Sequence, residues 1–254
     1  MLSLGRMHRQ SWAKSRKTGK LNSINLSDYA QIVFFTGAGM SAESGIPTYQ
    51  GEGGVWEKYN FEEYACESAF KKDPEKVLKF HEIRRQNIDV CKPHIGHDII
   101  SNLQKIHTSV TIITQNIDGM HQKSGSEKVI ELHGSLWQLR CTDEGTVIED
   151  SPAKYISYTC QCGAYLRPNI VWFGDKLNNK IVDKAYEKVS QADLFISIGT
   201  SGGVWPAADI PHYAKENGSR MIEINPAKSI ASYLYNEQIR TLSSEALLDL
   251  FKNA

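Results

Sequence analysis

The sequence lacks long hydrophobic runs, an excess of charge of either sign, and the many cysteines of a disulfide-rich protein. No stretch of its 254 residues approaches the roughly 18 continuous apolar residues of a membrane-spanning helix. Lys plus Arg and Asp plus Glu number 29 each, so no overall field attracts nucleic acid or an anionic membrane. The five cysteines are irregularly spaced and odd in number, which favours a reducing compartment. We therefore expect a cytoplasmic protein with no membrane or specific nucleic-acid partner.

The first 20 residues depart from this charge balance, because they contain several basic residues and no acidic one. We interpret residues 1–20 as a basic, flexible tail. An organelle transit peptide is also basic and poor in acidic residues, and Met7 could equally be the true start, so both alternatives stay open. The rest of the chain is long enough for one large domain, alone or with a small companion.

The stretch QIVFFTGAGMSAESG, residues 31–45, has the pattern of a buried strand that meets a tight turn and a helix N-terminus. Glycines let the backbone approach a phosphate closely, and the N–H groups of the next helix favour negative charge. An ordinary strand-to-helix turn can look the same. The dehydrogenase-type dinucleotide fingerprint also needs a second strand ending in an acidic residue about 20 positions on. Because a loop stands there, any dinucleotide site is of another kind.

Four further apolar segments have the composition of buried strands, at residues 110–114, 128–132, 194–198 and 220–224. Helical segments such as 74–90 separate them, which predicts an α/β fold with a doubly wound parallel sheet. Ligands bind outside the carboxyl ends of such strands, so the polar residues there are expected to share one crevice. These residues are Thr36, Gly37, Gln115, Asn116, Asp118, His133, Thr200, Ser201 and Asn225.

Two other regions have a different character. The segment 141–175 contains three cysteines and no helical period, which favours a small inserted module. The last part, 237–251, is expected to be one helix packed on the sheet.

Together these motifs resemble the sirtuin (Sir2-like) family of NAD-dependent protein deacylases, of the bacterial type similar to the class that includes desuccinylases. The matching stretches are GAGMSAESGIPTY, TQNIDGMHQKSG, ELHGS, RPNIVWFGD, GTSGGVWPA and EIN, in family order. The resemblance implies a Rossmann-like NAD-binding domain at residues 21–48, 101–133 and 176–254. It also implies a small inserted domain, made of a helical module at 49–100 and a zinc-ribbon-like module at 134–175.

The resemblance also implies roles for individual residues. His133 would be the general base, with Asn116 and Asp118 as further catalytic residues. Val171, Phe173 and Gly174 would pair with an extended protein segment that carries the acylated lysine. NAD would be bound by Gly37, Ala38, Gly39, Ser41, Glu43, Gln115, Asn116, Asp118, Gly199, Thr200, Ser201 and Asn225.

The reaction implied is transfer of a lysine acyl group to ADP-ribose with release of nicotinamide. A base must accept the proton of a ribose hydroxyl, and a histidine titrates in the range that suits this task. Protein ADP-ribosylation and NAD hydrolysis are alternatives, because they use the same activated ribose. A non-catalytic NAD-binding module is a third, although a module that only binds NAD would not need the base.

The cysteines depart from the two C-x-x-C pairs with which the family binds a structural zinc ion. The first pair is replaced by CTDE at 141–144, and the second is shortened to CQC at 160–162. Cys141, Cys160 and Cys162 could still bind zinc with Glu144 or Asp143 as the fourth ligand. The alternative is a ribbon that folds without metal.

Two further departures concern substrate and cofactor. Sirtuins that prefer acidic acyl groups hold the distal carboxylate with a Tyr-x-x-Arg pair, and here His81 precedes Arg84. Positions three apart share a helix face, so both side chains could enter one channel and favour succinyl or malonyl groups. Alternatively, His81 only packs, and the substrate is acetyl-lysine. Gln50 stands where the family commonly has arginine, which predicts a raised requirement for NAD.

Overall fold

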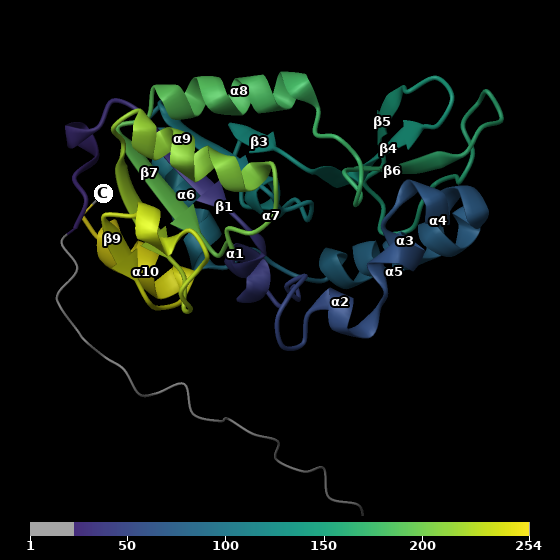
Figure 1. Cartoon of the computed structure of the whole chain (residues 1–254), viewed down its shortest axis with the longest axis horizontal. Helices are drawn as coiled ribbons and strands as arrows, with labels where there is room; N and C mark the ends of the chain where they lie inside the picture. Colours follow the sequence, from purple (N-terminus) through teal and green to yellow (C-terminus); the bar gives the residue numbers. More distant parts are fainter. Residues whose placement is uncertain (1–22, 254) are drawn as a thin grey trace, which may run out of the picture.

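The computed structural model describes residues 23–253. They form a six-stranded sheet and a separate three-stranded sheet (Figure 1). The tail predicted at residues 1–20 lies outside the described part of the chain. Within 23–253, no helix has the length and apolar character needed to cross a membrane.

All neighbouring strands of the large sheet are parallel, in the order β3-β2-β1-β7-β8-β9. This confirms the predicted doubly wound α/β class. In register, Thr36 lies beside Thr114 on one side and Ile198 on the other, so the polar strand ends share one edge. The strands are β1 (Ile32–Thr36), β2 (Val110–Thr114), β3 (Val129–Glu131), β7 (Leu194–Ile198), β8 (Arg220–Ile224) and β9 (Glu237–Ile239).

Helices cover both faces of this sheet, which explains the nearly continuous apolar runs of its strands. Ile32 and Phe34 belong to the core beneath α6 (Ile95–Ile106) and α10 (Ser243–Leu250). The alternate residues Val33 and Phe35 belong to the core beneath α8 (Asn179–Ser190) and α9 (Ile210–Glu216). Figure 1 shows α8 and α9 along the upper face of the sheet.

The single closing helix predicted at 237–251 is wrong in its first part. Glu237–Ile239 forms β9, which pairs with β8, and α10 begins only at Ser243. Ile239 is buried in the core, whereas Gln238 is exposed, so the segment alternates as an edge strand does. Three residues are too few for this alternation to stand out from a helical pattern.

Helices α2 to α5 and the small sheet lie on the opposite side of the molecule from α10 (Figure 1). The small sheet has the order β5-β4-β6 and is antiparallel. It shares a hydrophobic core with α5, in which Val77 and Leu78 lie with Leu136 and Leu139. These elements are α2 (Val55–Lys58), α3 (Phe61–Tyr64), α4 (Glu67–Lys72), α5 (Pro74–Asp89), β4 (Gly134–Cys141), β5 (Val147–Glu149) and β6 (Leu166–Ile170).

A buried ion pair joins α5 to the segment that follows β5. Arg85 Nη1 lies 2.7 Å from Asp150 Oδ2, and both side chains are almost completely buried. The guanidinium also lies over the rings of Trp137 and Tyr155, at 5.2 and 4.4 Å from their centroids. Because each charge has lost its water, each depends on the other.

We predict that Asp150→Ala lowers the free energy of unfolding by about 3–5 kcal/mol, because it leaves Arg85 charged, buried and unpaired. Denaturant unfolding measures the effect. Lys71→Ala is the matched control, since it breaks an exposed pair with Glu67, and it should change stability little. Equal losses in the two variants would contradict the assignment of Arg85–Asp150 as a structural pair.

Candidate active site

Two glycine turns meet where the strand order reverses, between β1 and β7. The Gly37 amide donates to the Ile198 carbonyl, and the Gly39 amide donates to the Gly199 carbonyl, each at 2.9 Å. A Cβ atom on Gly39 would lie 2.7 Å from the Gly199 Cα atom, and Gly199 has a φ angle of +62°. Only glycine suits this contact and this dihedral angle. Three predicted cofactor residues are thus brought together.

Asn116 connects the end of β2 to the first glycine turn. Its Nδ2 atom donates to the Gly37 carbonyl at 3.0 Å and to Ser41 Oγ at 3.2 Å. Its backbone amide donates to Thr114 Oγ1 at 3.0 Å. Asn116 and Ser41 are both buried, so these bonds are shielded from competing water. The short helix α1 (Ala38–Ala42) is held against β2 in this way.

Asp118 and Gln115 extend this cluster along the crevice. Asp118 is buried, and desolvation raises the pKa of its carboxyl group, although Oδ1 accepts the Met120 amide at 2.9 Å. A small cavity of about 10 Å³ lies between Asp118, Asn116 and Ala38. Gln115 Nε2 is buried and has no hydrogen-bond partner among the described residues. A buried donor without a partner needs an explanation, and a bound ligand would supply one.

His133 has the tautomer that a general base needs. Its Nδ1 atom lies 2.9 Å from the Gln115 carbonyl oxygen. Since a carbonyl only accepts, Nδ1 carries the proton, and Nε2 keeps its lone pair. Burial lowers the pKa of the imidazole, with the bond to Gln115 acting in the opposite direction. The ring is therefore neutral at pH 7.

Glu43 lies in the predicted cofactor region, but its carboxylate binds the start of α10. Oε1 accepts Ser243 Oγ at 2.6 Å and the Ser244 amide at 3.1 Å, and Oε2 accepts Ser244 Oγ. Burial raises the pKa of this group, but the serine hydrogen bonds outweigh it and the net pKa is lowered. Glu43 thus fixes α1 to α10, a contact that the sequence pattern did not indicate.

The ends of β7 and β8 place three further predicted cofactor residues together. Asn225 Nδ2 donates to the Thr200 carbonyl at 2.9 Å. Thr200 Oγ1 accepts the Gly202 amide at 3.0 Å, and Ser201 is exposed beside it. This pair of turns leaves the Ser201 side chain accessible at the rim of the crevice.

The predicted substrate segment follows β6 and lies beside His133. The Val171 amide donates to the His133 carbonyl, and the Phe173 amide donates to the Ala65 carbonyl, each at 2.9 Å. Phe173 is half exposed, and its ring lies 4.4 Å from that of Phe61. Gly174 has a φ angle of +88°. Both amides are therefore already paired within this protein.

His81 and Arg84 do not share a channel, contrary to the sequence expectation. His81 is completely buried, with Nε2 at 3.1 Å from the Tyr64 carbonyl and 3.3 Å from Trp172 Nε1. Burial lowers its pKa to about 3, so it supplies no positive charge. Arg84 instead donates to Tyr49 Oη at 2.9 Å and lines a cavity of about 450 Å³. Helical spacing could not show that Trp172 and Tyr64 enclose His81.

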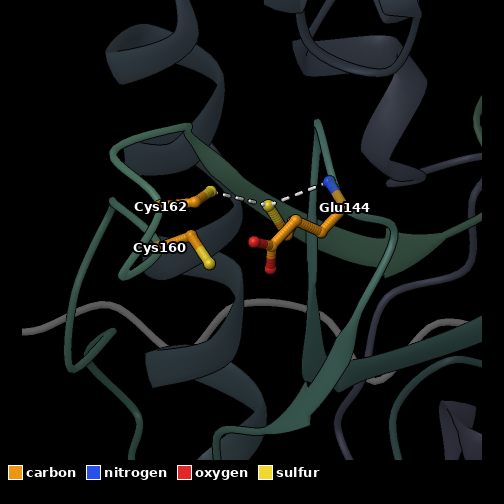
Figure 2. A group of neighbouring side chains, drawn as sticks. Glu144, Cys160 and Cys162 are labelled. Atoms are coloured by element: carbon orange, nitrogen blue, oxygen red, sulfur yellow. Dashed lines mark hydrogen bonds between the residues drawn. The ribbon is translucent and has the colours of Figure 1, made fainter.

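The metal-ligand candidates converge at one end of the small sheet. The ligand atoms of Cys141, Glu144, Cys160 and Cys162 all lie within 4.8 Å of one another. Figure 2 shows the Glu144 carboxylate and the sulfur atoms of Cys160 and Cys162 turned towards a common point. Cys141 Sγ lies 3.5 Å from Cys162 Sγ and accepts the Glu144 amide. Of the two candidate carboxylates, the structure places Glu144 in the cluster.

Comparison with known proteins identifies the family. The model of the Sir2 family matches residues 37–206. The chain belongs to the Sir2 family. An NAD-dependent protein deacylase of Aquifex aeolicus is 41% identical over 223 residues, which cover 87% of this chain and 93% of that protein. NAD-dependent protein deacylase 2 of Pyrobaculum aerophilum is 43% identical over 224 residues, 87% of this chain and 90% of that protein.

Solved structures of Sir2 homologues superpose closely on this sirtuin. A Sir2 homologue in complex with ADP-ribose matches with a TM-score of 0.85 and 39% identity, covering 88% of this chain and 91% of that one. A Sir2 protein with a deacetylated p53 peptide and 3′-O-acetyl-ADP-ribose has a TM-score of 0.80 and 28% identity, covering 90% and 95%. The separate small sheet is thus part of a fold shared with sirtuins.

Sequence reasoning missed two residues that shape this site. Trp137 Nε1 donates to the Asp118 carbonyl at 2.8 Å, and its ring leaves no room for a Cβ atom on Gly119. Tyr49 accepts the Arg84 hydrogen bond and lines the small cavity. Tyr49 is the last residue of a matched motif, GAGMSAESGIPTY, which was a usable signal. Trp137 lies in the small sheet, and no local pattern places it against Asp118.

The cysteine and glutamate cluster of this sirtuin is compatible with zinc. Tetrahedral sites with Zn–S bonds of about 2.3 Å place neighbouring ligand atoms roughly 3.8 Å apart, close to the observed separations. Thiolates and a carboxylate are both accepted zinc ligands. Four protein ligands would leave no open position, so the metal would have a structural role.

We predict that the purified protein binds one zinc ion. Glu144→Ala should weaken zinc binding by at least about 10-fold, because one of the four ligands is lost. Three thiolates remain, so binding should not be abolished. Competition with a chromophoric chelator measures the affinity. Asp143→Ala is the matched control, since it removes the adjacent carboxylate outside the cluster. If both variants lose affinity equally, Glu144 is not a ligand.

Proposed function

We propose that this chain is an NAD-dependent protein lysine deacylase, which transfers the acyl group to ADP-ribose and releases nicotinamide. The observation that carries this proposal is the state of His133, a neutral imidazole with Nδ1 fixed and Nε2 free, in the crevice with Asn116 and Asp118. A base of this kind suits a reaction in which a hydroxyl must lose its proton. The names of the Aquifex and Pyrobaculum relatives support the same activity.

The residues of the crevice fit NAD. The glycine turns bring bare backbone to its floor, and Gln115 Nε2 offers a buried donor without a partner in the described structure. We assign the pyrophosphate to the turn at Gly37, Ala38 and Gly39, with Ser41. We assign the nicotinamide and its ribose to Gln115, Asn116 and Asp118. The adenosine half belongs to the turns at Gly199, Thr200, Ser201 and Asn225, whereas Glu43 acts indirectly through α10.

The residues of the crevice have separate roles in the proposed reaction. NAD, when bound, supplies the ribose carbon that receives the acyl oxygen once nicotinamide has left. Asn116 is held by Gly37 and Ser41 in a fixed orientation, so its side chain does not need to reorient during the reaction. His133 accepts a ribose hydroxyl proton at Nε2, and Gln115 stabilises the resulting imidazolium through Nδ1.

The protein substrate is proposed to bind as an extended segment along Val171, Phe173 and Gly174. Recognition through backbone groups reads shape more than sequence. The Sir2 structure with a deacetylated p53 peptide supports a peptide as the substrate. The balanced charge supports the absence of a specific nucleic-acid partner, and the five cysteines support a cytoplasmic location.

We further propose a preference for acyl groups with a distal carboxylate, such as succinyl or malonyl. Arg84 supports it without help from His81, because its guanidinium lines both cavities that border Ile46 and Pro47. The larger cavity is also lined by Lys58, Lys76 and Lys79, and no acidic residue of the described chain lines it. A fixed guanidinium binds a carboxylate through charge-assisted hydrogen bonds.

The deacylase proposal predicts that nicotinamide release equals acyl loss when the protein acts on NAD and acylated-lysine peptides. His133→Ala should lower the rate at least about 100-fold, because the proton acceptor is lost. Mass spectrometry follows peptide, nicotinamide and acyl-ADP-ribose. His107→Ala, which removes a histidine bonded to the Tyr29 carbonyl, is the control and should keep the rate. Nicotinamide release without acyl loss would instead indicate ADP-ribosylation or NAD hydrolysis.

The acyl preference predicts that Arg84→Met reduces kcat/KM for a succinylated peptide about 10-fold relative to the acetylated peptide, because the distal carboxylate loses its partner. Lys105→Met, which removes an exposed cation from α6, should leave this ratio unchanged. If Arg84→Met leaves the ratio of kcat/KM for the two peptides unchanged, the proposed acidic-acyl preference is wrong, whereas deacylation itself is unaffected.

A further inference from the structure

Behind the crevice, three histidines lie close together at α6 and α7 (Met120–Lys123). The ring centroids of His94 and His97 lie 4.4 Å apart, and those of His97 and His121 lie 5.0 Å apart. His97 and His121 are fully buried. Within residues 23–253, His97 Nε2 and His121 Nδ1 have no hydrogen-bond partner. Burying such groups is unfavourable, and an apolar side chain would pack as well.

The hydrogen bonds of these rings fix their tautomers. The His94 amide donates to His97 Nδ1 at 3.4 Å, so a neutral His97 carries its proton on Nε2. His121 Nε2 lies 3.0 Å from Thr36 Oγ1, and that hydroxyl donates its only proton to Thr114 Oγ1 at 2.8 Å. His121 therefore donates from Nε2, and its Nδ1 is an acceptor.

Both rings are neutral at pH 7, because burial lowers the pKa of His97 to about 2 and that of His121 to about 3. The adjacent rings thus offer one unused donor, His97 Nε2–H, and one unused acceptor, His121 Nδ1. Neither atom is paired with the other in the described structure.

From His121, a continuous chain of hydrogen bonds leads to the crevice. It passes through Thr36 and Thr114, and Thr114 Oγ1 accepts the Asn116 amide at 3.0 Å. Asn116 in turn binds the Gly37 carbonyl and Ser41 Oγ. The chain therefore ends at the groups assigned to the nicotinamide ribose and the pyrophosphate.

We propose that His97 and His121 are positioning residues, which hold Asn116 and the glycine turn in the NAD-binding geometry through Thr36 and Thr114. The inference rests on the proposed NAD site but not on the identity of the acyl acceptor. The His97 ring packs against His121, and His121 orients the two threonine hydroxyls by leaving Thr36 one direction in which to donate. A core histidine with a packing role alone would not need this order.

Three substitutions at His121 separate positioning from packing. Gln places an amide donor near the former Nε2 and keeps the bond to Thr36. Asn places its polar atoms near the former Nδ1 and loses that bond, and Leu loses both. By calorimetry, we expect His121→Gln to bind NAD within about 3-fold of wild type, and His121→Asn and His121→Leu roughly 10-fold more weakly.

His107→Leu is the matched control, because it removes a histidine at the far end of α6 whose Nε2 lies 3.0 Å from the Tyr29 carbonyl. It should bind NAD as wild type does. The proposal is overturned if His121→Asn binds NAD as tightly as His121→Gln, or if His107→Leu weakens NAD binding as much. Should His121→Leu fail to fold, the Gln and Asn pair still decides the outcome.

A second readout needs neither NAD nor turnover. In protein labelled with ¹⁵N-histidine, NMR should show His97 and His121 as neutral rings with the proton on Nε2 at pH 7, and His97 should keep that tautomer in His121→Gln. A proton on His121 Nδ1, or a charged ring, would overturn the proposed positioning role even if deacylase activity is found. Conversely, loss of the deacylase proposal would leave both readouts intact.

Discussion

The contact between the backbones of Gly39 and Gly199 is the constraint on which the rest of the site depends. Strand order reverses between β1 and β7, and at this point the two following turns touch with no side chain between them. The amide of Gly39 is satisfied by the carbonyl of Gly199, so neither turn needs water there. The crevice is therefore floored by backbone, and the polar residues that end the neighbouring strands surround it.

Those polar residues are held by one another before any ligand binds. Asn116 is fixed by Gly37 and Ser41, the His133 ring by the Gln115 carbonyl, and Glu43 by the start of α10. Buried polar groups that satisfy each other resist displacement, because an unpaired group in a low dielectric is unfavourable. Gln115 Nε2 is the exception, because it has no hydrogen-bond partner in the part of the chain that the structure describes.

The sequence predicted most of the fold because burial on both faces leaves a strong pattern. The segments 110–114, 194–198 and 220–224 are strands with those bounds. Composition could not separate β9 from the following helix, because a three-residue edge strand has little periodicity. Helical spacing placed His81 near Arg84 but gave no information on Trp172, which encloses it. The four metal-ligand candidates do converge, whereas the domain division and the assigned roles of site residues stay predictions.

The small sheet links the candidate metal cluster at one end of β4 to His133, the proposed base, at the other. β4 begins at Gly134, directly after His133, and ends at Cys141, while β6 pairs with both ends of it. A Cβ atom on Gly134 would lie 2.0 Å from the Asn169 carbonyl oxygen, so the two strands close tightly beside His133. β6 then continues to Val171, whose amide binds the His133 carbonyl. A metal at the cluster would thus stabilise the far end of these paired strands, which lead to the proposed base, His133, and to the proposed substrate segment.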